Sequence, residues 1–219
     1  MGKSLTLKMT KSVSIHGQNF ILHPTGAIFW EEEDLLLISD VHLGKISHFR
    51  KYGSAVPRQA ILGNFEKLDE VCHFFNPQKI VFLGDLFHSA LNKEWIYFEE
   101  WLQNISPEVI LVEGNHDIIS PLKYEALGIR IYEELVLQNF LLTHHPEERS
   151  GYFNFSGHIH PGVRISGLAR QTLKLPCFFK SPGQMILPAF GEFTGKHILE
   201  PKKEDEVYVV TKDEVILLK

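Results

Sequence analysis

The sequence predicts an α/β (α+β) fold in which two mixed β-sheets pack face to face with helices outside, a four-layer α-β-β-α sandwich. Three observations predict it. The first half of the chain alternates strand-like and helix-like runs, the second half is mostly short strand-like runs, and Gly and Pro separate many of these. Two packed sheets covered by helices bury both patterns. The length of 219 residues suits a single domain over residues 1–219.

In the first half, each strand is a short apolar run and each helix is a run with helical spacing. The predicted helices span 56–75, 93–103 and 121–127, and Gly128 ends the last of these. The predicted strands are residues 12–15, 20–22, 27–30, 79–83 and 108–112, together with an apolar run inside 34–40 that ends abruptly in polar residues.

From Gly128 onward the pattern changes to strands alone. The predicted strands are 129–131, 135–137, 140–143, 153–156, 177–180, 184–187, 206–211 and 214–218. The sequence contains no internal repeat and no linker-like stretch of low complexity.

Histidine is the unusual feature of the composition, with 12 residues against two cysteines. Cys72 and Cys177 form no CxxC motif and cannot make a disulfide scaffold. A hydrophobic fraction of 44% and a charged fraction of 22% are ordinary for a globular protein and exclude a disordered chain. A metal site in this chain would use nitrogen and oxygen ligands rather than thiolates.

The charge and the apolar runs exclude several classes of protein. The net charge is −5, so no overall basic charge indicates nucleic acid. Residues 1–10 contain no apolar core of a signal peptide, and the longest apolar runs are too short to cross a bilayer. We expect a cytoplasmic protein without a membrane partner.

Polar clusters follow the predicted strands. In an open α/β sheet ligands bind at the carboxyl ends of strands, so consecutive strands deliver such clusters to one edge. Asp40 and His42 are two residues apart, as are His158 and His160, and in extended backbone each pair points to one side. The clusters are Asp40-Val41-His42, Gly84-Asp85, Gly114-Asn115-His116-Asp117, Thr143-His144-His145 and Gly157-His158-Ile159-His160.

The order of these clusters resembles that of the calcineurin-like metallophosphoesterases. The segments 39–45, 156–162 and 187–195 are further similar to the DNA-ligase-associated metallophosphoesterases of bacteria, which are encoded beside a ligase and a helicase. The resemblance implies two metal ions bridged by Asp85. It implies that the first is held by Asp40, His42, Asp85 and His160, and the second by Asp85, Asn115, His144 and His158.

The residue types agree with that implication. A carboxylate has two oxygens and can serve two ions. Mixed His, Asp and Asn ligands favour Mn²⁺, with Fe or Zn as alternatives, over Mg²⁺. Two ions about 3.5–4 Å apart can share and deprotonate one water, and this bridging hydroxide then attacks phosphorus in line.

The leaving group needs a proton, and His116 is the candidate acid because it follows Asn115 and precedes Asp117. Asp117 could fix the tautomer of His116 and raise its pKa, or it could cap the helix that begins near Pro121. His88 occupies a position where many members of the superfamily carry an acid, so it could contact phosphate or only line the site. We expect His145 to be structural.

Basic residues gather near the motifs despite the acidic total. Residues 41–58 carry four basic residues and no acid, and residues 149–199 carry six basic residues and one acid. Arg50 and Arg164 are therefore candidates for binding substrate phosphate, together with His88. The alternative is a solvated surface with scattered charges.

The sequence thus favours a two-metal phosphodiesterase. The resemblance implies a DNA nuclease in DNA repair, with a DNA ligase and a DEXH-box helicase as protein partners. One alternative is a phosphoesterase acting on nucleotides or cyclic nucleotides. The other is a non-catalytic adaptor for the helicase or ligase, which the competent residues at all seven ligand positions argue against.

Overall fold

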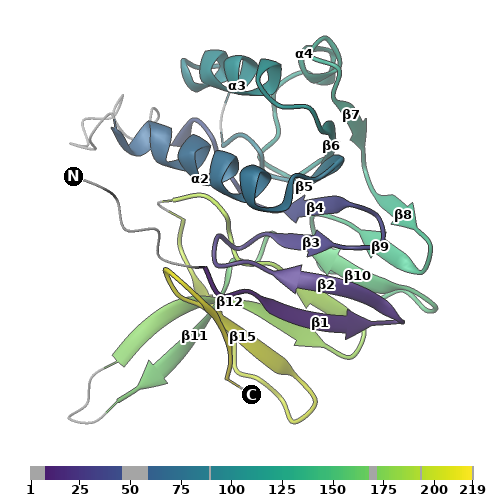
Figure 1. Ribbon diagram of the computed structural model, residues 1–219, viewed down its shortest axis with the longest axis vertical. Coiled ribbons are helices and arrows are strands. Elements are labelled where there is room, and N and C mark those ends of the chain that lie inside the picture. Colours follow the sequence, from purple (N-terminus) through teal and green to yellow (C-terminus); the bar gives the residue numbers. More distant parts are fainter. Residues whose placement is uncertain (1–7, 46–58, 89, 168–171, 193, 219) are drawn as a thin grey trace.

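A computed structural model describes residues 8–45, 59–88, 90–167, 172–192 and 194–218 (Figure 1). Its first sheet contains seven strands in chain order, from β1 to β7. Neighbours from β1 to β4 are antiparallel, and neighbours from β4 to β7 are parallel. The strands are β1 (Lys11–Ile15), β2 (Gln18–Leu22), β3 (Ile28–Trp30), β4 (Leu35–Ile38), β5 (Lys79–Leu83), β6 (Glu108–Val112) and β7 (Arg130–Tyr132).

The second sheet is also mixed, with β10 parallel to both β9 and β13. Its order is β14-β11-β12-β13-β10-β9-β8, and β15 pairs with β12 and β16. Its strands are β8 (Leu135–Leu137), β9 (Phe140–Leu142), β10 (Phe153–Ser156), β11 (Pro161–Ser166), β12 (Thr172–Ser181), β13 (Gln184–Ile186), β14 (His197–Ile198), β15 (Glu206–Val210) and β16 (Val215–Leu217).

Two large apolar clusters hold the layers together. One lies between the sheets and joins residues such as Phe20 and Leu37 to Phe155 and Phe178. The other lies between the first sheet and three helices, α2 (Gln59–Phe75), α3 (Glu94–Gln103) and α4 (Pro121–Glu125), which lie together on one side of the molecule (Figure 1). Successive strand residues alternate between these faces, since Leu36 and Ile38 face the helices while Leu35 and Leu37 face the other sheet.

The predicted fold class is confirmed, with two mixed sheets packed face to face and a helical layer over the first. Each of the three helices that the structure describes contributes to the cluster on the first sheet, so the described residues include no helical layer over the second sheet. Nor do they include a helix long and apolar enough to cross a membrane.

Most of the predicted elements form, but some of the observed strands were not predicted. The strands β5, β6, β8 and β10 have the predicted bounds. β11 and the first half of β12 were not predicted, because Pro161, Gly162 and Pro176 disfavour a strand. The pairing of β11 with β12, from Gly162 opposite Pro176 to Ser166 opposite Thr172, stabilises both segments nonetheless.

Candidate metal centre

The candidate site lies where the parallel strands of both sheets end. Asp40, Asp85 and Asn115 follow β4, β5 and β6, which are neighbours in the first sheet, while His144 and His158 follow β9 and β10 in the second. Backbone hydrogen bonds fix the loops to one another, since the N–H of His42 donates to the carbonyl of Asp85 at 2.9 Å. The prediction that consecutive strands deliver these clusters to one edge is therefore confirmed.

The backbone that presents these side chains is not extended, in contrast to the expectation from the sequence. Asp40, His42, Asp85, His158 and His160 all have positive φ, between 51° and 65°. Non-glycine residues rarely adopt this left-handed conformation, which costs free energy and is concentrated at functional sites. The paired residues do converge, but through two left-handed residues in each loop rather than through the alternation of a strand.

Asp40 is fully buried and only partly satisfied. Its Oδ2 accepts the backbone N–H of His158 at 3.0 Å, whereas its Oδ1 accepts no hydrogen bond from the described residues. The Nε2 of His160 lies 3.2 Å from that Oδ1. Burial alone would raise the pKa of Asp40, but contact with His160 and the nearby His144 and His42 hold it below its ordinary value. An ionised buried oxygen without a donor is what a metal ligand requires.

Asp85 faces histidines from both sheets. Its Oδ1 lies 3.5 Å from the Nε2 of His144 and accepts the backbone N–H of His116 at 2.9 Å. Its Oδ2 lies 3.7 Å from the Nε2 of His42. The two oxygens thus point toward different imidazoles, as a carboxylate shared by two ions would.

One ring nitrogen of His144 forms a hydrogen bond with the backbone. Its Nδ1 lies 2.9 Å from the carbonyl oxygen of Leu83, and because a carbonyl can only accept, Nδ1 carries the proton. Its Nε2 then presents a lone pair 3.0 Å from the Oδ1 of Asn115 and 3.2 Å from the Nδ1 of His158. This is the usual arrangement of a metal-binding histidine, whose other ring nitrogen donates to a backbone carbonyl.

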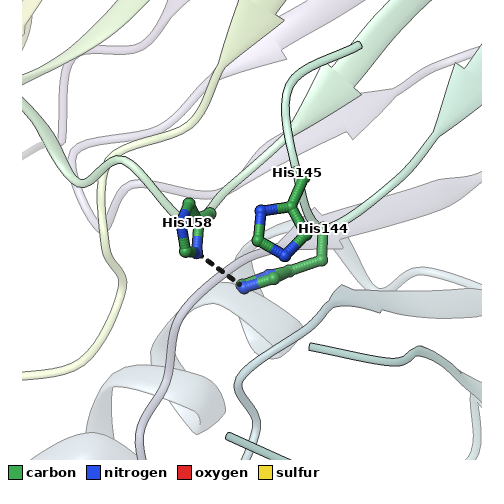
Figure 2. Close-up of side chains that lie close together, drawn as sticks. All are labelled: His144, His145 and His158. Atoms are coloured by element: carbon green, nitrogen blue, oxygen red, sulfur yellow. Dashed lines mark hydrogen bonds between the residues drawn. The ribbon is translucent and has the colours of Figure 1, made fainter. Parts of the chain in front are cut away.

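His145 lies in the same cluster, although we expected it to be structural. Figure 2 shows His144, His145 and His158 close together, with the centroids of the His145 and His158 rings 4.1 Å apart. His145 is exposed, and its ligand nitrogen lies within 4.8 Å of those of the other two. The sequence held a weak signal for this, the adjacency of two histidines in a loop.

These donor atoms fit a pair of divalent ions. Three groups have ligand atoms within 4.8 Å of one another: Asp40, His42 and His160; Asp40, Asp85 and His144; and His144, His145 and His158. On the first side, the Nε2 atoms of His42 and His160 approach to 3.2 Å, and burial lowers the pKa of His42 to about 3, so its ring is neutral. Buried carboxylates and neutral imidazoles form a candidate binuclear metal site.

Glycines let the loops approach this closely. A Cβ on Gly84, which has φ +78°, would lie 2.3 Å from the Nδ1 of His144. A Cβ on Gly157 would lie 2.4 Å from the Oδ2 of Asp40. Larger residues at these positions would displace the side chains that face the site.

The predicted catalytic pair is placed near this cluster, with contacts that differ from the expected ones. The His116 ring lies beside those of His42 and His88, with centroid separations of 5.6 Å and 4.8 Å. The carboxylate of Asp117 instead accepts the backbone N–H groups of Phe87, at 3.1 Å, and Gly114, at 2.9 Å. Asp117 thereby ties together the loops after β5 and β6, and burial raises its pKa to about 6.

The alternative prediction that Asp117 caps the helix near Pro121 was wrong, because Ser120 is the N-cap residue of α4.

The predicted phosphate-binding residues have different positions. His88 contacts the site, with its Nδ1 3.4 Å from the Nδ1 of His42. Of the predicted phosphate-binding arginines, Arg164 is exposed on β11, opposite Lys174, and Arg50 lies outside the described residues. Lys45 belongs to the basic segment 41–58 but was not among the predicted site residues, and it interacts electrostatically with both Asp85 and Asp40.

Comparisons with known proteins agree with this geometry. The sequence profile described as calcineurin-like phosphoesterase matches residues 34–175, which include Asp40 and His160. Among solved structures, the nuclease MPE of Pseudomonas putida is similar, with 27% identity, a TM-score of 0.79, and coverage of 95% of this chain and 100% of that one.

A second solved structure, of the phosphoesterase Yfce from E. coli, shows 17% identity and a TM-score of 0.45 over 83% of this chain and 96% of that one. No curated protein matches the sequence. The profile covers well over half of the chain and includes the strand ends that carry the buried carboxylates and histidines. The chain therefore belongs to the calcineurin-like phosphoesterases, a family of metal-dependent enzymes.

Proposed function

We propose that this phosphoesterase hydrolyses phosphodiester bonds in DNA and acts in DNA repair. The observation that carries the proposal is the similarity to a nuclease over 95% of this chain and 100% of that one, at 27% identity. The proposal treats residues 1–219 as a single metallophosphoesterase domain, and takes the protein to be cytoplasmic with a DNA ligase and a DEXH-box helicase as partners.

The proposed ligands follow the two sides of Asp85. Asp40, His42, Asp85 and His160 would hold one ion, and Asp85, Asn115, His144 and His158 the other. We propose Mn²⁺ as the metal, with Fe or Zn as alternatives, because the donors are mixed nitrogen and oxygen. When bound, two such ions activate a water for attack and neutralise charge on the phosphoryl oxygens.

Groups of the protein itself orient the proposed ligands, supply the proton and bind the substrate. The backbone N–H of His116 holds Oδ1 of Asp85, and the peptide N–H of His158 holds Oδ2 of Asp40, so both carboxylates are oriented before substrate binds. His116 is the proposed acid, because its ring lies against those of His42 and His88 at the edge of the cluster. His88, Arg50 and Arg164 are proposed to bind substrate phosphate.

A panel of substrates with Mn²⁺ tests this function. It contains a simple phosphodiester, a phosphomonoester, cyclic nucleotides, and single- and double-stranded DNA, each with wild type and Asp85→Ala. We expect cleavage of DNA and of the simple diester, and loss of both in the variant. Cleavage confined to monoesters or to cyclic nucleotides would contradict the proposal, and two bound ions without any cleavage would favour an adaptor.

A further inference from the structure

A cavity of about 340 Å³ opens beside the candidate metal centre. The proposed ligand His160 forms one wall, and Lys67, Thr194 and Lys196 contribute polar groups, with Glu192 the one acid among the lining residues. The volume is in the range of small-molecule sites and suits one nucleotide rather than a duplex. The cavity therefore adjoins the place where a phosphodiester would be cleaved.

The segment that lines this cavity is joined to the metal centre by its backbone. The N–H of Phe190 donates to the carbonyl of Ser39 at 2.9 Å, and the N–H of Gly191 donates to the carbonyl of Asp40 at 3.0 Å. The hydroxyl of Thr194 then donates to the carbonyl of Gly191 at 3.0 Å. The cavity wall is thus hydrogen-bonded to the backbone of the loop that carries Asp40.

Lys67 brings a partly buried cation into this cavity from α2. Its Nζ donates to the carbonyl of Phe190 at 2.5 Å and lies 4.3 Å from the centre of the Phe190 ring. An ammonium has three N–H donors, so this contact leaves capacity for a further acceptor. Burial lowers the pKa of Lys67 to about 8, which leaves the side chain mostly charged at pH 7.

A second cavity, of about 620 Å³, continues the first away from His160. The two share Lys67, Pro176, Ala189 and Glu192, so they form one groove. Acids balance the lysines in this outer part, where Lys8 pairs with Glu70 at 3.4 Å. The excess of positive charge is therefore confined to the inner part, next to His160.

We propose that this groove binds the single-stranded nucleotide chain next to the scissile bond, with Lys67 and Lys196 contacting its neighbouring phosphate. The inference rests on the proposed function and names the substrate form that the site accepts. An ammonium surrounded by protein, such as that of Lys67, attracts a phosphate oxygen more strongly than one in bulk water.

The groove proposal is tested by measuring binding and cleavage separately. A fluorescent 20-nucleotide single strand is titrated with protein in Ca²⁺ buffer, and the same strand and bis(p-nitrophenyl) phosphate are cleaved with Mn²⁺. The main variant is Lys196→Gln, because Lys196 is exposed and its replacement should not disturb folding. Lys67→Gln is the second variant, and the matched control is Lys203→Gln, which lines a different cavity.

We expect each groove variant to weaken binding of the strand by about 5–20-fold, with kcat/KM on bis(p-nitrophenyl) phosphate within twofold of wild type. The slope of log K against log salt should fall by about 0.7 for each phosphate that the variant no longer neutralises. Lys203→Gln should change neither quantity. The groove proposal is overturned if Lys196→Gln and Lys67→Gln bind the strand like wild type, or if wild type does not bind the strand. It is also overturned if a DNA duplex of the same length binds with the same dependence on the two lysines.

The two proposals fail in different ways. If wild type binds the strand in a lysine-dependent manner but cleaves no DNA, the proposed nuclease function fails and the groove stands. If wild type cleaves DNA and neither lysine affects binding or cleavage, the groove fails and the nuclease function stands.

Discussion

The Nδ1 of His144 lies 2.9 Å from the carbonyl oxygen of Leu83, so the last residue of β5 sets the tautomer of a histidine that follows β9. The contact crosses from one sheet to the other. It orients the ring so that Nε2 faces Asn115 and Asp85. The candidate metal centre is therefore assembled only when both sheets have packed against each other.

Replacing His144 tests the second ion directly. We expect His144→Ala to reduce the bound metal from two ions per chain to one, and activity by at least about 100-fold, because a proposed ligand of the second ion is removed. Metal content by mass spectrometry after Mn²⁺ loading and desalting measures this. His73→Ala is the control, since His73 is exposed on α2 and its ring hydrogen-bonds to the carbonyl of Asp69 in the same helix. Two ions retained in His144→Ala would rule out the assignment.

Gly84 and Gly128 form a matched pair of positions for testing what an added Cβ does when another side chain lies close to the backbone. Their φ angles are +78° and +80°, but a Cβ at Gly84 would lie 2.3 Å from the His144 ring, whereas one at Gly128 would meet nothing within 4 Å. Gly128→Ala should therefore cost only the left-handed strain, about 1–2 kcal/mol. Gly84→Ala should cost more and also weaken metal binding, because the buried His144 ring must move.

Urea denaturation with EDTA measures the two free energies of unfolding, and calorimetric titration with Mn²⁺ measures the affinities. Equal metal affinities in Gly84→Ala and Gly128→Ala would show that the His144 ring adapts to the added methyl group.

The parts of the fold that could be predicted are those fixed by local sequence. The strands β5 and β6 are continuous apolar runs buried on both faces, so their bounds are visible without knowledge of the rest of the chain. β11 and the start of β12 are stabilised by pairing with each other, which outweighs the effect of Pro161 and Pro176. That stabilisation is tertiary, and no local pattern reveals it.

The sequence predicted that the strand-end residues lie together, but not the geometry of their backbone. The order of the motifs brought Asp40 and Asp85 to one edge, but the left-handed backbone of both was not foreseen. Lys67 carried no signal, because its neighbour Phe190 lies 123 positions away in the sequence. Contacts of that kind depend on how the layers pack, which a single sequence does not record.

His116 can be tested by varying the leaving group. A general acid matters for a nucleotide alkoxide, which is strongly basic, and much less for p-nitrophenolate, which leaves without a proton. We expect His116→Ala to lower kcat on DNA by about 100-fold or more and kcat on bis(p-nitrophenyl) phosphate by less than about fivefold. His197→Ala, at an exposed position on β14, is the control. Equal losses on both substrates would assign His116 a structural role.

His23 should make stability depend on pH below neutrality. The ring is fully buried, its Nδ1 accepts the N–H of Thr25 at 3.2 Å, and burial lowers its pKa from 6.5 to about 4, assisted by the charges of Lys8 and Lys67. Protonation at Nδ1 would break that hydrogen bond. Because the unfolded chain takes up the proton at higher pH than the folded chain, the stabilisation is complete above pH 6.5 and is lost as the pH falls toward 4.

The expected loss over that interval is up to about 3 kcal/mol, from 1.36 kcal/mol for each pKa unit. Urea denaturation at several pH values, with EDTA to keep metal out, measures it. In His23→Asn an amide oxygen replaces the acceptor nitrogen and does not titrate. The variant should be less stable at pH 7 but should lose less stability than wild type between pH 6.5 and 4. The lysines near His23 stay charged throughout this range, so parallel pH curves for the two proteins would mean that His23 is protonated in the folded state as readily as in the unfolded chain.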